Sequence, residues 1–157
     1  MPPAAPQHPA LDRDLASIQE ARRLLCAAAD AAAAWARADQ EETDRVCAAM
    51  ASAASREAER LARLARDETG MGRYQDKVLK NRFAAEDVWR AYAPLRTRGV
   101  VRVDRDARIK ELAVPMGVVA ALTPSTNPTS TAIYKAIIAV KAGNAIVFAP
   151  HPRATRC

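Results

Sequence analysis

The stretch over residues 117–148 most constrains the fold, because two continuous apolar runs flank a helix-like segment. Residues 117–122 (GVVAAL) and 145–148 (AIVF) are typical of strands buried on both faces. A polar loop and a helix over about 128–141 separate them, and Gly143 occupies the position that favours a C-cap glycine. This order predicts a βαβ unit, whose parallel strands require a sheet with more members. We therefore predict an α/β fold that is unfinished within these 157 residues.

Three helices are predicted upstream, over residues 12–38, 40–68 and 74–93, because apolar residues recur there at helical spacing. Gly70 follows the second helix as a terminating residue. The apolar stripe of the first helix includes Leu15, Ile18 and Leu25, and the predicted buried face of the third holds Val78, Ala85, Trp89 and Tyr92. Residues 100–114 predict a β-hairpin, since β-branched runs flank a short polar turn.

Composition and charge argue against several classes of protein. The net charge is +6, but Lys and Arg alternate with Asp and Glu, which is typical of solvated helix faces. The three cysteines are widely spaced without a CxxC pair, so neither a zinc site nor a disulfide framework is indicated, and a reducing compartment fits best. The sequence predicts no membrane span and no secretory signal, and the first ten residues, with four prolines, predict a disordered tail.

The loop over residues 123–128 (TPSTNP) is the first candidate site. A GxGxxG fingerprint is absent, yet α/β sheets bind ligands where a strand ends in a loop that opens a helix. Backbone N–H groups at such a helix start suit an anionic group. Asn127 precedes Pro128 there, and taken alone this pair favours a helix N-cap.

Three stretches carry a resemblance to a known family: 123–128 (TPSTNP), 141–146 (KAGNAI) and 150–154 (PHPRA). Residues 68–72 (ETGMG) and 77–87 (KVLKNRFAAED) agree with it. Together they resemble the CoA-acylating branch of the aldehyde dehydrogenase superfamily, over about residues 12–157. The resemblance implies an N-terminal fragment of an enzyme that converts an aldehyde and CoA to acyl-CoA, with NAD as cofactor. The residues do not distinguish NAD from NADP.

The resemblance assigns Asn127 a catalytic role, in place of the simple cap. The matching asparagine in the family holds the substrate oxygen, which becomes an anion when a cysteine thiolate attacks the aldehyde. An N–H donor there stabilises the tetrahedral thiohemiacetal, typically by about 3 kcal/mol. Hydrolytic members of the family place their asparagine one residue nearer the preceding proline, so the register differs by one position.

The resemblance also predicts two cofactor-binding segments. Thr123, Pro124, Ser125 and Thr126 match the segment that lines the nicotinamide-side ribose. Ala149, Pro150, His151 and Pro152 match the strand end beside the adenosine ribose and phosphates. Hydrolytic members usually have a ribose-binding lysine at the Ala149 position, and Ala suits the acylating branch. For His151, contact with the ADP moiety and a plain loop position stand as equal alternatives.

Cys157 is not expected to be the nucleophile, because it follows the second strand and lies away from Asn127. The family nucleophile belongs to a later domain, so we expect the isolated chain to be inactive. The predicted organisation is a tail over 1–10, a helical N-terminal layer over 11–95, a hairpin that contributes to oligomerisation over 96–116, and the start of a dinucleotide-binding domain over 117–157.

The expected partners are an aldehyde and CoA, in a cytoplasmic homo-oligomer with no membrane or nucleic-acid partner. Two alternatives remain open from the sequence. One is a non-catalytic helical fragment that acts in assembly. The other, weaker one is a basic nucleic-acid-binding module.

Overall fold

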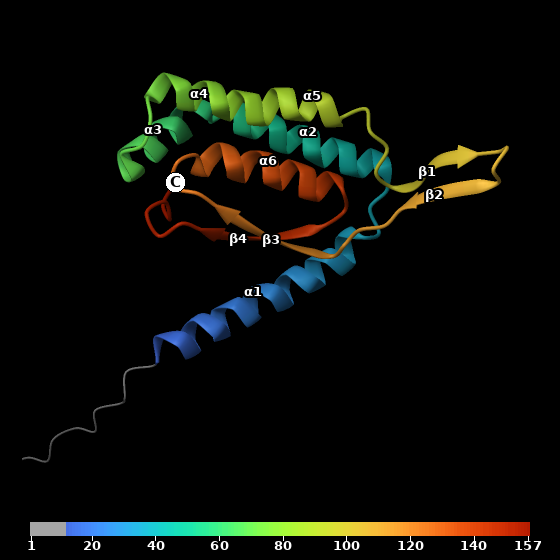
Figure 1. Cartoon of the computed structure of the whole chain (residues 1–157), viewed down its shortest axis with the longest axis horizontal. Helices are drawn as coiled ribbons and strands as arrows, with labels where there is room; N and C mark the ends of the chain where they lie inside the picture. The colour runs from blue at the N-terminus through green and yellow to red at the C-terminus, as the bar shows by residue number, and fades with distance from the viewer. Residues whose placement is uncertain (1–11) are drawn as a thin grey trace, which may run out of the picture.

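The computed structural model describes residues 12–157, so the predicted tail over residues 1–10 lies outside the described residues. A helical layer, a central helix, a two-stranded parallel sheet and a long first helix lie one above the other, and a hairpin projects from one end (Figure 1). The elements are α1 (Arg13–Trp35), α2 (Gln40–Arg56), α3 (Ala58–Thr69), α4 (Tyr74–Arg82), the π-helical turn η1 (Phe83–Asp87), α5 (Val88–Tyr92), β1 (Gly99–Asp104), β2 (Ile109–Ala113), β3 (Val118–Thr123), α6 (Pro128–Lys141) and β4 (Ala145–Pro150).

The predicted βαβ unit is present as β3, α6 and β4. The two strands pair in parallel, in a register that runs from Val118 opposite Ala145 to Thr123 opposite Pro150. Asn144, in the turn before β4, accepts hydrogen bonds from the backbone N–H groups just before β3, at 2.7 and 3.0 Å. These bonds align the starts of both strands, so the strands also end together. The α/β prediction is confirmed.

Gly143 ends α6 and leads into β4. Its φ of +86° lies in the left-handed region, which favours glycine. A Cβ at this position would also overlap the Arg98 guanidinium and lie 2.8 Å from Cγ of Pro115. Both the backbone conformation and the close packing therefore require glycine here.

The helical layer follows the predicted pattern with one correction. The predicted second helix is two helices, α2 and α3, separated at Glu57, whose φ of −91° and ψ of 1° are not helical. The predicted third helix is continuous but contains the wider π-helical turn η1. Small side chains allow close packing in this layer: Ala58, Ala62, Ala65, Ala84 and Ala85 are almost fully buried.

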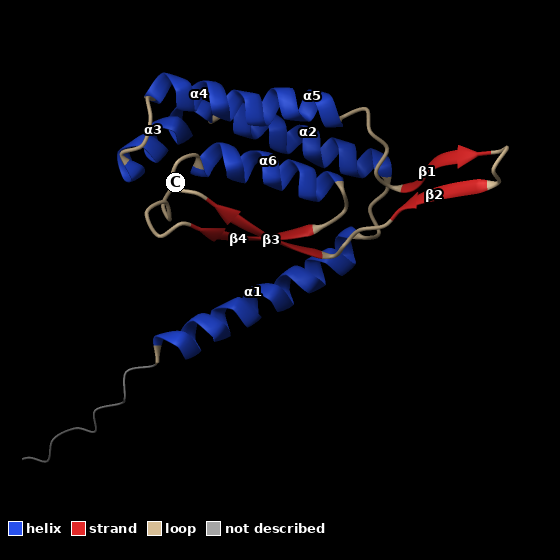
Figure 2. Ribbon diagram, in the orientation of Figure 1, coloured by secondary structure: helices blue, strands red, loops and turns tan. Residues whose placement is uncertain are grey.

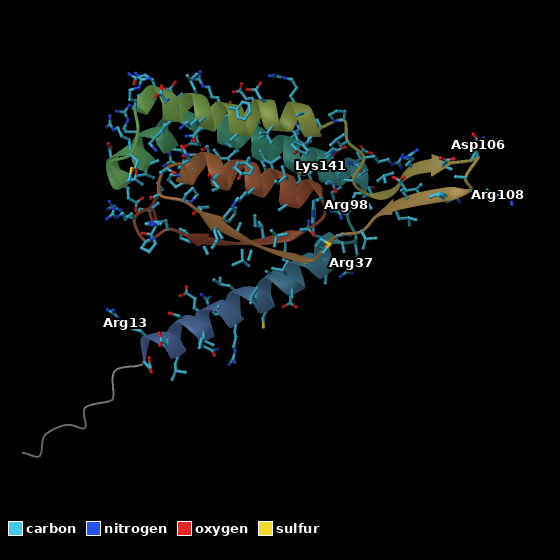
Figure 3. The ribbon with its side chains drawn as sticks, viewed as in Figure 1. Arg13, Arg37, Arg98, Asp106, Arg108 and Lys141 are labelled. Atoms are coloured by element: carbon cyan, nitrogen blue, oxygen red, sulfur yellow. The ribbon has the colours of Figure 1, made fainter. Side chains whose placement is uncertain are left out.

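Two buried cations join the helical layer to its neighbours. Lys141 at the end of α6 contacts the Asp44 carboxylate of α2 and donates to the Ala93 carbonyl at 3.1 Å. Arg98 donates to Thr43 Oγ1 at 2.9 Å. Both cations lie where α2 and α6 meet the base of the hairpin (Figure 3). Because each cation bonds to more than one element, the two side chains join the layers at this junction.

The apolar stripe of the first helix suggests a buried face along its whole length, but most of this stripe is exposed. Figure 2 shows α1 on the side of the β3–β4 sheet opposite α6, with its carboxyl-terminal end close to the strands and the rest running away from them. Leu15, Ile18 and Leu25 are 61%, 49% and 48% exposed, while Ala28 is buried. The Trp35 indole N–H donates to the Val140 carbonyl at 3.1 Å and anchors the carboxyl end of the helix. Only that end of α1 therefore meets the sheet.

Two predictions of buried side chains are wrong. Tyr92, assigned to the buried face of the third helix, is 41% exposed. Leu122, assigned to a strand buried on both faces, is 72% exposed, because the two-stranded sheet leaves this position uncovered within the described residues. No helix in the described range 12–157 has the length and apolar character that a membrane span requires.

Candidate functional site

The candidate site lies at the carboxyl ends of β3 and β4. Thr123 is the last residue of β3 and lies opposite Pro150, the last residue of β4. The His151 N–H donates to the Thr123 carbonyl at 3.0 Å, which extends the pairing by one bond. The structure therefore brings together the two segments that the sequence predicted separately, residues 123–127 and 149–152.

The predicted residues form an accessible rim around this junction. Thr123 is buried at 8% exposure, where it closes the base of the rim. Ser125 and Asn127 are half-buried, and Pro124, Thr126, Ala149, Pro150, His151 and Pro152 are exposed. Within the described chain, a ligand can reach the junction from solvent. This arrangement matches the general location of ligand sites in parallel α/β sheets.

Asn127 precedes the first residue of α6, yet its side chain does not cap the helix. Its carboxamide oxygen accepts a hydrogen bond from the Lys80 ammonium at 3.0 Å. The amide nitrogen has one neighbouring acceptor, Thr126 Oγ1, at a long 3.4 Å. The Asn127 side chain therefore does not have the capping role that the residues alone favoured. Its amide N–H remains available to another acceptor.

One face of α4 holds the loop on both sides of Asn127. Lys77, Lys80 and Asn81, which we call the α4 clamp, occupy positions i, i+3 and i+4 and so share a helix face. Lys77 is 4% exposed, and its Nζ donates to the Thr126 carbonyl at 3.0 Å. Burial lowers the pKa of Lys77, and the neighbouring charge of Lys80 lowers it further.

Asn81 completes the α4 clamp from a position that is 1% exposed. Its side-chain oxygen accepts from Thr129 Oγ1 at 2.8 Å, and its amide donates to the Ala58 carbonyl at 2.9 Å. It therefore joins the first turn of α6 to the start of α3. A role for the α4 clamp was not predicted from the sequence, although two lysines and an asparagine on one helix face were a signal for it.

Glu68 holds the segment that follows the rim. Its carboxylate accepts backbone N–H bonds from Thr155 at 2.9 Å, Arg156 at 2.9 Å and Cys157 at 2.8 Å. Burial alone would raise the pKa of Glu68, but these hydrogen bonds outweigh it and hold the pKa below the usual value. Glu68 thus docks the chain after β4 onto the end of α3.

Neither Cys157 nor His151 has the surroundings of a nucleophile and its base. Burial, together with a hydrogen bond to Glu68 and its charge, raises the pKa of the Cys157 thiol to about 11. Because the thiolate is the reactive form, this thiol is inactive near neutral pH. His151 Nδ1 accepts the Arg153 N–H at 3.1 Å within its own loop. The structure gives no support to Cys157 as the nucleophile.

The chain matches known proteins over nearly its whole length. The model of the aldehyde dehydrogenase family matches residues 3–157. The bifunctional aldehyde-alcohol dehydrogenase AdhE of Escherichia coli K12 is 45% identical over 115 residues, which are 73% of this chain and 13% of that protein. The acylating sulfoacetaldehyde dehydrogenase of Cupriavidus necator is 40% identical over 140 residues, 88% of this chain and 28% of that protein.

Solved structures agree with these relatives. The acetylating aldehyde dehydrogenase of Geobacillus thermoglucosidasius superposes with a TM-score of 0.91 at 51% identity, covering 94% of this chain and 33% of that one. The Rhodopseudomonas palustris propionaldehyde dehydrogenase with bound propionyl-CoA has a TM-score of 0.70 at 31% identity, covering 86% and 30%. The chain thus spans a third or less of each of these proteins. It belongs to the aldehyde dehydrogenase family, and the relatives described here include acylating members.

Proposed function

We propose that this chain is the N-terminal part of an NAD-dependent enzyme that converts an aldehyde and CoA to acyl-CoA through a cysteine thiohemiacetal. The observation that carries the proposal is the position of Asn127 in the loop after β3, where its amide N–H has only a long 3.4 Å contact with Thr126 Oγ1 and can donate to a substrate oxygen. The acylating relatives support the reaction class. On this proposal the nucleophilic cysteine belongs to a part of the protein outside these 157 residues.

In this reaction Asn127 acts on the substrate oxygen. Attack of a thiolate on the aldehyde carbon turns the carbonyl oxygen into an anion, and the amide N–H of Asn127 donates to it. A donor already held in place stabilises the charge without reorganising at the moment of reaction. The α4 clamp keeps this donor at the rim, since it anchors the loop at Thr126 and Thr129.

The rim residues fit a dinucleotide. Residues 123–126 and 149–152 lie side by side at the ends of two parallel strands, and most of them are exposed. When bound there, NAD supplies the hydride acceptor of the reaction. Residues 123–126 would line the nicotinamide-side ribose, and residues 149–152 the adenosine ribose. Ala149 has no side-chain donor, so ribose contacts at this position depend on backbone groups and on His151 or its neighbours.

The hairpin of β1 and β2 supports a homo-oligomer. It projects from the body of the chain (Figure 1) and exposes Val103, Ile109 and Leu112 at 51%, 54% and 63%. Exposed apolar side chains on such an arm suit contact with another subunit. We also infer a cytoplasmic location, which the three free cysteines support.

An assembly fragment without catalysis is the alternative that a specific observation favours, because α1 exposes Leu15 and Ile18 as well. On that alternative, the purified chain would bind a full-length acylating relative without contributing to its turnover. A nucleic-acid module is less well supported, because many arginines pair with carboxylates of the same chain. These include Arg60, Arg73, Arg82, Arg90 and Arg102.

The test is a hybrid enzyme in which this chain replaces the matched third of the Geobacillus thermoglucosidasius enzyme. CoA-dependent NADH formation would be measured with acetaldehyde, propionaldehyde and sulfoacetaldehyde. We expect turnover by the hybrid and none by the 157-residue chain alone. Turnover by the chain alone that Cys157→Ser abolishes would overturn the proposal.

Asn127 variants of the hybrid test its assigned role. Asn127→Ala should lower kcat by roughly a hundredfold while KM for NAD changes little, because the effect belongs to the transition state. Asn127→Asp is the matched variant, since its carboxylate has nearly the same shape and can still accept from Lys80 but offers no N–H. A fully active Asn127→Asp hybrid would remove Asn127 from the mechanism.

A further inference from the structure

We propose that Lys80 is a positioning residue, whose ammonium orients the Asn127 carboxamide so that its N–H faces the substrate oxygen. The proposal rests on the oxyanion role of Asn127 given above and adds the residue that makes this role possible. Lys80 comes from α4, forty-seven residues earlier in the chain, and reaches the rim from the helical layer.

The chemistry of the contact determines the orientation of the amide. A lysine ammonium only donates hydrogen bonds, so the atom that faces Lys80 Nζ at 3.0 Å must be the Asn127 oxygen and not the nitrogen. The amide nitrogen is thereby turned to the opposite side of the carboxamide. Its neighbour Thr126 Oγ1 lies at 3.4 Å, the long limit of a hydrogen bond, and leaves an N–H free to donate.

The other two residues of the α4 clamp hold the loop, which leaves Lys80 to hold the Asn127 side chain. Lys77 binds the backbone carbonyl of Thr126. Asn81 binds the side chain of Thr129. Both are buried, at 4% and 1% exposure, so their bonds are part of the core. Lys80 is exposed, and its hydrogen bond within residues 12–157 goes to the Asn127 carboxamide. Replacing Lys80 leaves no fully buried polar group without a partner. The substitution should therefore change the orientation of the Asn127 amide without unfolding the loop.

The first experiment tests this geometry in the 157-residue chain itself. The chain contains three asparagines, Asn81, Asn127 and Asn144, so asparagine-selective ¹⁵N labelling gives three pairs of side-chain amide signals. Lys80→Met should shift the Asn127 pair and speed its exchange with water, while the distant Asn144 pair stays unchanged. Lys110→Met, the same change at an exposed lysine of the hairpin, should shift none of them. An Asn127 pair that is identical in wild type and Lys80→Met would overturn the proposal.

The second experiment tests the catalytic consequence in the hybrid enzyme. We expect Lys80→Met to lower kcat roughly tenfold, with KM for NAD and the melting temperature nearly unchanged, because a loosely held donor stabilises the transition state less. Lys80→Arg, which keeps a charged donor, should restore most of the loss. Lys77→Met should instead lower the melting temperature, since it removes a buried bond.

A double-mutant cycle separates positioning from a direct electrostatic effect of Lys80. If Lys80 acts through Asn127, Lys80→Met should cost nothing further once Asn127→Ala is present. An equal loss in both backgrounds would contradict the positioning role. A normal kcat for Asn127→Ala would refute the oxyanion step of the proposed function, and the amide signals would then show separately whether Lys80 still orients Asn127.

Discussion

The Lys141 ammonium contacts the Asp44 carboxylate between α6 and α2, with the lysine side chain at 2% exposure and the aspartate side chain at 36%. The same ammonium donates to the Ala93 carbonyl at 3.1 Å and lies 5.5 Å from the centre of the Trp89 ring. One charge therefore joins the carboxyl end of α6 to α2 and to α5 with its C-cap residue.

Breaking this pair from the carboxylate side should destabilise the chain. Asp44→Leu leaves a buried ammonium without its counter-charge, and we expect a loss of about 2 kcal/mol, reduced from the fully buried case by the partial exposure of Asp44. Adding Lys141→Met should recover part of the loss, because the buried charge is then gone. Urea titrations of the single and double variants measure both effects. A double variant less stable than Asp44→Leu alone would contradict this account.

Gly143→Ala should lower the free energy of unfolding by about 3 kcal/mol, because left-handed strain and a steric overlap act together. The new Cβ would meet the Arg98 guanidinium and Cγ of Pro115. Gly70→Ala is the matched control, since Gly70 has a φ of +68° but nothing within 4 Å of the added Cβ. Its cost should be about 1 kcal/mol. Equal losses in the two variants would show that the overlap relaxes freely.

The three cysteines should differ in their reaction with a thiol reagent at pH 8. Cys26 is exposed and should react first. Burial raises the pKa of Cys47 to about 11, so about one thiol in a thousand is a thiolate at pH 8, and full burial blocks access. Cys157 should react slowly, and Glu68→Gln should speed it by removing the adjacent charge. Mass spectrometry of the labelled peptides gives the order. A Cys157 rate that Glu68→Gln leaves unchanged would contradict the assigned cause.

The docking of residues 155–157 should depend on pH through Glu68. The pKa of Glu68 is lowered from 4.5 in the folded chain, so its contribution to the stability of the docked segment is fully present above pH 4.5. The contribution is lost as the pH falls from there through the folded pKa. The protection factors of the Thr155, Arg156 and Cys157 amides, measured relative to intrinsic exchange at each pH, should therefore fall under acid, and Glu68→Gln should remove this pH dependence. Acid-insensitive protection of all three amides in the wild type would refute the prediction.

The sequence by itself determined the local elements near the site. The apolar runs at 117–122 and 145–148 and the helix between them predicted the βαβ unit, and its parallel pairing is confirmed. The left-handed glycines at 70 and 143 end helices where their positions predicted. These features depend on a residue's own backbone preferences and on the period of its neighbours, and both can be read from a short stretch of chain.

Only the tertiary structure decided which side chains meet at the rim. The contact between Lys80 and Asn127 joins α4 to the start of α6, and nothing local to either residue specifies it. The same holds for Glu68, which binds a segment eighty-seven and more residues away. Tertiary packing also left Leu15 and Leu122 exposed although their local patterns are apolar. Burial and hydrogen-bond partners depend on which elements lie opposite each other in space, and the periodicity of one segment does not specify this.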